Sequence, residues 1–161
     1  MNKDKILREQ LLSLLKGGNA HMTFDQAVED FPLNKVNDIF PNGTYTPWHL
    51  IEHIRRTQND ILEFVVSPEY KDKHWPEDYW PKDSEKASQK EWDETIRLFH
   101  KDQKELEKII LDEKTDLFKK IPWGDGQTIL REIQLAADHN AYHIGEFAIM
   151  RQVMGTWGKN H

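Results

Sequence analysis

Apolar side chains recur at intervals of three or four residues in four long stretches of the chain, and no other feature restricts its fold as strongly. The stretches cover residues 3–16, 47–66, 88–111 and 128–154, and each places its large apolar residues on one side of an α-helix. No stretch shows the alternation of apolar and polar residues that is typical of a strand. The pattern therefore predicts an all-α fold, a four-helix bundle without a sheet of consequence.

Signals at the ends of these stretches support the same assignment. Thr46 can cap the second long helix, with Pro47 at the first helical position, where a missing N–H costs nothing. Gly155 is a typical C-terminal cap for the last helix. We also expect a short extra helix that begins after Thr23, its cap, and ends at about Asp30.

Two connecting segments have no helical periodicity. Residues 115–127 form a loop, and residues 67–87 form a longer linker that contains Trp75, Tyr79 and Trp80 among several prolines. A linker of about 20 residues is long for a compact protein and is often functional. Its large rings carry much apolar area, so we expect this linker, between the second and third main helices, to pack over or beside the bundle.

Length, charge and cysteine content exclude several classes of protein. A chain of 161 residues of which 37% are hydrophobic suits a single domain over residues 1–161. Its net charge of -6 argues against a nucleic-acid-binding protein, and no apolar run approaches the roughly 18 residues of a membrane span. The charged start of the chain is unlike a signal peptide, so we expect a cytoplasmic protein. Because there is no cysteine, chemistry must depend on the histidines and carboxylates.

Two histidines stand in the middle of the apolar side of the last helix. His139 and His143 are four residues apart, so their rings lie one turn apart on the same face. Buried imidazoles must find hydrogen-bond partners or bind something, because an unpaired buried polar group costs about 1–3 kcal/mol. Such a pair can hold a first-row metal ion, although by itself it is also compatible with hydrogen-bonded core histidines.

A third ligand is available on the second long helix. His53 lies at the edge of that helix's apolar arc, whereas His49 is rotated by about 40° toward solvent and is expected at the rim. An antiparallel bundle that brings His53 against His139 and His143 would place three nitrogens around one point. Open positions for water or substrate would remain, as in a catalytic metal site.

Three carboxylates lie near these histidines in the sequence. Glu146 follows His143 by three residues and is a candidate partner of a ligand, a fourth ligand or a general base, with a solvated surface glutamate as the alternative. Glu52 and Asp138 point away from the apolar arcs, so we expect both to be solvated.

The residues around the candidate ligands resemble the motifs of the DinB-like superfamily of four-helix proteins. Residues 46–54 and 60–64 resemble its second-helix motif, and residues 124–128 and 138–145 resemble its last-helix motif. The aromatic linker is similar to that of one branch, and the resemblance extends over residues 40–155.

This resemblance implies an up-down-down-up bundle, often a homodimer, that binds a divalent metal ion. The metal-binding histidines of the motif match His53, His139 and His143, and Glu146 stands where the family often has glutamine. Zinc or nickel is expected first, with manganese or iron as further ions that accept imidazole.

Family members of known activity move thiol groups, and they include bacillithiol transferases and mycothiol-dependent isomerases. The resemblance therefore implies a metal-dependent transferase that takes a small-molecule thiol and an electrophile, with Glu146 or a bound water as proton acceptor. The alternatives are a metal-dependent hydrolase with the same residues, and a non-catalytic metal-binding protein of the stress response.

Overall fold

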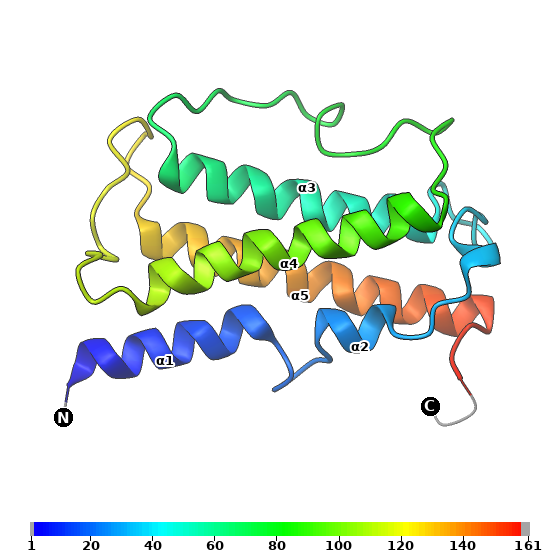
Figure 1. The fold of residues 1–161 in the computed structure, drawn as a ribbon, viewed down its shortest axis with the longest axis horizontal. Coiled ribbons are helices and arrows are strands. Elements are labelled where there is room, and N and C mark those ends of the chain that lie inside the picture. The colour runs from blue at the N-terminus through cyan, green and yellow to red at the C-terminus, as the bar shows by residue number, and fades with distance from the viewer. Residues whose placement is uncertain (1, 159–161) are drawn as a thin grey trace.

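The computed structural model describes residues 2–158, which form an all-α fold. Its elements (Figure 1), in chain order, are α1 (Lys3–Lys16), α2 (Phe24–Val28), the 3-10 helix η1 (Leu33–Lys35), α3 (Pro47–Val66), α4 (Gln89–Leu111) and α5 (Ile129–Met154). Within the described residues, β pairing is limited to an isolated bridge between Lys120 and Thr128. The helices predicted from apolar spacing are confirmed.

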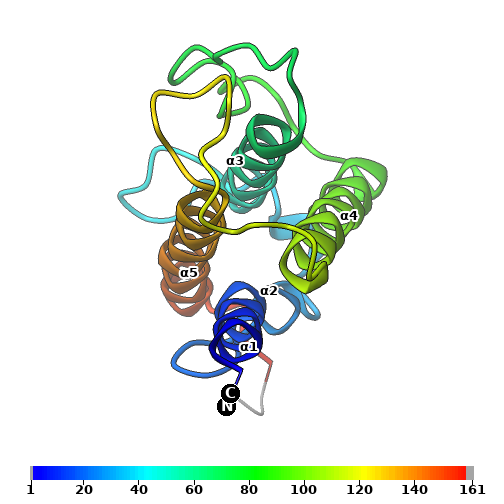
Figure 2. The same cartoon turned by 90° about the vertical axis from the view of Figure 1, so that its left-hand side faces the viewer.

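The four main helices pack around a common interior. Helix α3 contacts α4 and α5, and α1 contacts the same two helices from the opposite side, while α2 packs on α5. The end-on view in Figure 2 shows α1 and α3 at opposite corners of this arrangement. Following the colours in Figure 1, α1 and α5 run in one direction and α3 and α4 in the other. The bundle is therefore up-down-down-up, as the resemblance implied.

The parallel course of α3 and α4 explains the length of the linker between them. A helix of 20 residues, such as α3, is about 30 Å long. The chain must return over that length before α4 can begin, and Figure 1 shows residues 67–88 running back alongside α3. The expected packing holds for Tyr79 and Trp80, which are half-buried. Trp75 is 67% exposed, although its ring lies beside that of Tyr79, with centroids 5.6 Å apart.

Local signals set most helix ends where they were expected. The Thr46 side chain accepts a hydrogen bond from the His49 backbone N–H, and Gly155 takes the left-handed conformation that ends α5. Helix α2 ends at Val28, earlier than expected, because Glu29 already has an extended ψ of 131° and Asp30 follows with a φ of 52°, neither of which is helical.

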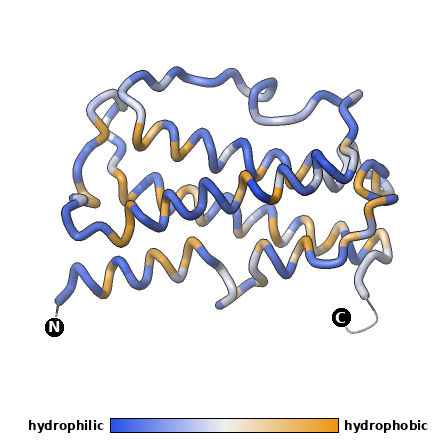
Figure 3. Tube along the Cα trace, viewed as in Figure 1, coloured by the Kyte–Doolittle hydropathy of each residue, from blue (hydrophilic) through white to orange (hydrophobic). Residues whose placement is uncertain are grey.

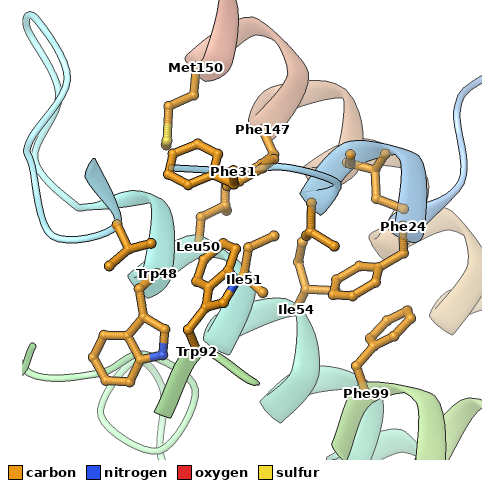
Figure 4. Close-up of a cluster of buried hydrophobic side chains, with 14 of the residues drawn as sticks. Phe24, Phe31, Trp48, Leu50, Ile51, Ile54, Trp92, Phe99, Phe147 and Met150 are labelled. Carbon is orange, nitrogen blue, oxygen red and sulfur yellow. The ribbon is translucent and has the colours of Figure 1, made fainter. Parts of the chain in front are cut away.

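The buried apolar side chains form two clusters along the bundle. Figure 4 shows the first, in which α2 contributes Phe24 and α4 contributes Phe99, with ring centroids 3.7 Å apart. The second lies around Leu106, Ile110 and Ile133. Figure 3 shows hydrophobic residues recurring along the helices, whereas the linker over α3 is largely hydrophilic.

Between the two clusters the interior is polar. The Gln58 side-chain amide donates to the carbonyl oxygen of Phe99, and its own oxygen accepts from the Asn140 amide, both at 2.8 Å. Gln58 and Asn140 are buried. His139 directly precedes Asn140 in α5, and His143 lies about one turn further along the same helix. The two halves of the apolar core therefore flank a polar layer that holds the candidate site. Among the described residues, no helix is long and apolar enough to cross a bilayer.

Candidate metal centre

Three histidine rings meet at this polar layer, one from α3 and two from α5. The Nε2 atom of His53 lies 3.1 Å from Nε2 of His139 and 3.3 Å from Nε2 of His143. One ligand atom from each of the three residues lies within 4.8 Å of the others. His53 is buried, and the two α5 histidines are half-buried. The residues that the sequence singled out are therefore brought together by the packing of α3 on α5.

Hydrogen bonds on the far side of two rings determine which nitrogen carries the proton. His53 Nδ1–H donates to the backbone carbonyl of Tyr79 at 3.1 Å, and His143 Nδ1–H donates to Glu146 Oε2 at 2.6 Å. A carbonyl oxygen can only accept, and an ionised carboxylate also only accepts, so both Nδ1 atoms are protonated. Each of these Nε2 atoms then directs a lone pair into the centre of the cluster.

This arrangement fits a metal ion. Lone pairs that converge without a cation between them repel one another, whereas a bound cation makes the same geometry favourable. Metal-binding histidines typically donate their other N–H to a carbonyl or a carboxylate, as His53 and His143 do here. Nδ1 of His139 is buried without a hydrogen bond of normal geometry, so this ring is the least constrained of the three.

Burial keeps the three rings uncharged. Removal from water lowers the pKa of His139 to about 3 and that of His143 to about 4, and repulsion from the neighbouring imidazoles adds to both effects. Burial also lowers the pKa of His53, although the Tyr79 carbonyl partly offsets this. At neutral pH all three residues are therefore in the form that binds metal ions.

Glu146 lies behind His143, on the side of that ring away from the cluster. One of its oxygens accepts from His143 Nδ1–H, and the other accepts a hydrogen bond from the hydroxyl of Tyr45. Burial raises the pKa of Glu146. Of the roles considered from the sequence, the one that this geometry shows is hydrogen-bond partner of a candidate ligand. Tyr45 carries no sequence signal that would have identified it.

The linker covers the cluster on the His53 side. The indole ring of Trp80 stacks on the His53 imidazole, with ring centroids 3.9 Å apart and an interplanar angle of 7°. Arg56 donates to the Trp80 carbonyl at 3.0 Å and so ties this part of the linker to α3. A residue of the aromatic linker thus forms one wall of the site.

Two predictions for α3 are wrong, because the linker covers His49 and helix α4 covers Glu52, whose carboxylate accepts a hydrogen bond from the Thr95 hydroxyl at 2.9 Å. His49 was expected at the rim but is 4% exposed, and its Nε2–H donates to the Glu85 carbonyl. Glu52 was expected in solvent but is buried in contact with Arg55 and Arg56. Residues 49–53 spell the His-x-x-Glu-His pattern of one class of zinc protease, yet only His53 joins the cluster.

The remaining histidines lie outside the cluster. His100, expected at the surface, is half-buried and pairs with Asp25 at 2.8 Å. His74 is exposed in the linker, and His21 Nδ1 lies 2.7 Å from the carbonyl of its neighbour in a connecting turn. Asp138 is exposed, as expected, and His161 lies outside the described residues.

Fold and site together define an all-α bundle with an interior three-histidine cluster that could hold a metal ion. The family model described as the DinB superfamily matches residues 19–147, which is most of the chain. The protein therefore belongs to the DinB superfamily. Searches of curated proteins and of solved structures find no match.

Proposed function

We propose that the protein binds one divalent metal ion through the Nε2 atoms of His53, His139 and His143. The observation that carries this proposal is the convergence of three imidazoles, two of which have Nδ1 held by an acceptor. All three donors are neutral imidazoles, which suits zinc or nickel and also accommodates manganese or iron. With three protein ligands, positions stay open for a substrate, as in catalytic rather than structural sites.

We further propose that this centre serves transfer of a low-molecular-weight thiol to an electrophile. The support for the thiol is the motif resemblance to thiol-transferring members of the DinB superfamily, to which the chain belongs. A metal ion bound there would supply a Lewis acid, which favours the thiolate over the neutral thiol. Trp80 would shield the His53 side of the site from water, and Glu146 would hold His143 in its binding orientation.

The thiol must lose its proton before its sulfur attacks the electrophile. Because Glu146 lies behind His143, on the side away from the cluster, our candidate route takes the proton to a water at the open side of the site and from that water to Glu146. Burial raises the pKa of this carboxylate, which makes it a stronger base than an exposed glutamate. Both of its oxygens are engaged, one by Tyr45 and the other by His143, so one of these hydrogen bonds must open for it to take the proton. The sulfur then forms its bond to the electrophile as the leaving group departs with its electron pair.

Metal analysis and adduct trapping test the two parts of this proposal in turn. Protein purified without an affinity tag should contain about one equivalent of a divalent metal, and removing it with a chelator should abolish activity. The metal-loaded protein is then incubated with small thiols and a panel of electrophiles, and thioether products are identified by mass spectrometry. If the electrophile is hydrolysed and no thioether forms, the protein is a metal-dependent hydrolase and not a thiol transferase. If the protein contains metal but converts none of the electrophiles in the panel, the result favours a non-catalytic metal-binding protein.

A further inference from the structure

A buried carboxylate on α3 anchors the aromatic linker. The Asp60 side chain accepts hydrogen bonds from the hydroxyl of Tyr79 at 2.6 Å and from the hydroxyl of Tyr70 at 3.0 Å. Lys73 Nζ approaches the same carboxylate at 3.6 Å, and Asp60 is only 7% exposed. Burial and the adjacent carboxylate raise the pKa of both tyrosines, so both hydroxyls keep the proton that they donate.

Tyr79 connects this anchor to the histidine cluster. Asp60 follows His53 by seven residues, so the two side chains lie on the same face of α3 about two turns apart. Tyr79 spans this gap: its hydroxyl contacts Asp60, while its backbone carbonyl accepts the Nδ1–H of His53 at 3.1 Å. One linker residue therefore joins the carboxylate to the imidazole.

The backbone next to Tyr79 is also held from the other side. The Trp80 ring stacks on His53, and its carbonyl accepts from Arg56, whose guanidinium in turn donates to Glu52 at 2.9 Å. These contacts fix the residue that follows Tyr79, while Tyr79 itself is held through its hydroxyl by Asp60, so the carbonyl is positioned from both sides. The carbonyl and the indole together constrain both the tilt and the rotation of the imidazole.

We propose that Tyr79 is a positioning residue for the metal centre. Its hydrogen bond to Asp60 holds its carbonyl on Nδ1 of His53, which selects the tautomer that leaves Nε2 free and aims this atom at His139 and His143. The inference rests on the proposed metal site, and it makes metal affinity depend on how the linker is anchored. Outer hydrogen-bond partners of metal-binding histidines typically change affinity by about 10–100-fold.

Two matched substitutions test this role. Tyr79→Phe removes the hydroxyl that reaches Asp60 but keeps the ring and the backbone carbonyl. Tyr70→Phe removes the other hydroxyl from the same carboxylate, and Tyr70 has no described contact with His53. Both variants lose one linker hydrogen bond to Asp60, so thermal unfolding of the pair reports the purely structural cost. If the two variants lose similar stability but differ in the His53 tautomer or in zinc affinity, that difference comes from the contact of Tyr79 with His53.

The first measurement uses the metal-free protein. In the wild type, ¹⁵N NMR of the imidazoles should show His53 as a single tautomer with the proton on Nδ1, and Tyr70→Phe should leave this unchanged. Tyr79→Phe should show exchange between tautomers or a population protonated on Nε2. A His53 that stays fully protonated on Nδ1 in Tyr79→Phe overturns the proposal.

The second measurement is zinc affinity, determined by competition with a chromophoric chelator. Tyr79→Phe should weaken zinc binding by about tenfold or more, whereas Tyr70→Phe should stay within about twofold of the wild type. Equal losses in the two variants would overturn the positioning role. If the wild type itself binds no zinc or other divalent ion, the proposed metal site fails, and the NMR comparison still decides whether Tyr79 orients His53.

Discussion

Acid should destabilise the metal-free protein in a pH range set by the histidine cluster. Folding lowers the pKa of His139 from its ordinary 6.5 to about 3 and that of His143 to about 4. Below about pH 6.5 the unfolded chain therefore takes up protons at these positions that the folded protein does not. The free energy of unfolding must decrease as the pH falls from about 6.5 toward 4.

The size of the effect follows from the number of protons involved. Each proton bound by the unfolded state alone changes the free energy of unfolding by about 1.4 kcal/mol per pH unit. His139 and His143 are fully protonated only in the unfolded state, so near pH 5 they lower the free energy of unfolding by about 2.7 kcal/mol for each unit that the pH falls. The lowered pKa of His53 adds to this decrease. Since domains are stable by only about 5–15 kcal/mol, two pH units should remove a large part of the stability.

Urea unfolding in the presence of a chelator, followed by circular dichroism between about pH 7.5 and 5, measures this dependence. The lowered pKa of the Glu52 carboxyl acts only below its ordinary value of 4.5. The raised pKa values of Glu146 and Asp102 act with the opposite sign toward the acidic end of the range, so the histidine contribution is taken from the difference between the wild type and a histidine variant. His139→Asn should lose about one proton's share of the slope, and His74→Asn, a change at an exposed position, should leave the slope intact. A flat dependence in the wild type, or an unchanged slope in His139→Asn, would refute the reasoning.

Four further substitutions address the site and the core. His53→Ala should abolish stoichiometric metal binding in elemental analysis. His49→Ala should retain the metal, because the His49 ring is held by a linker carbonyl outside the cluster. The opposite result would show that the ligand on α3 is misassigned. Glu146→Gln keeps a hydrogen-bond acceptor for His143 and should therefore retain the metal, while turnover falls by about 10²–10⁴-fold. Unchanged turnover would show that Glu146 only positions His143 and takes no proton. Phe99→Ala removes the ring of a residue that is 1% exposed, so the free energy of unfolding measured with urea should fall by about 3–5 kcal/mol. A decrease of less than about 1 kcal/mol would contradict the packing described.

The sequence by itself determined the helices and part of the site. Helix formation, capping and the side of a helix on which a residue lies depend on neighbours within about one turn, so apolar spacing sufficed to outline all four main helices. The same local geometry placed His139 and His143 on one face. The antiparallel packing of α3 against α5 then accounts for the position of His53, which already lay at the edge of its apolar arc.

Contacts made by the linker were decided only by the tertiary structure. Residues 67–87 have no periodicity that would indicate which side of α3 they cover, so His49 was expected at the rim and is in fact buried against this segment. Glu52 was expected in solvent and is buried against Thr95 of α4. The acceptor for His53 is a backbone carbonyl, which every residue possesses and no residue type reveals. Side-chain identity specifies local conformation, whereas the proton position and orientation of a buried imidazole depend on atoms brought to it from distant parts of the chain.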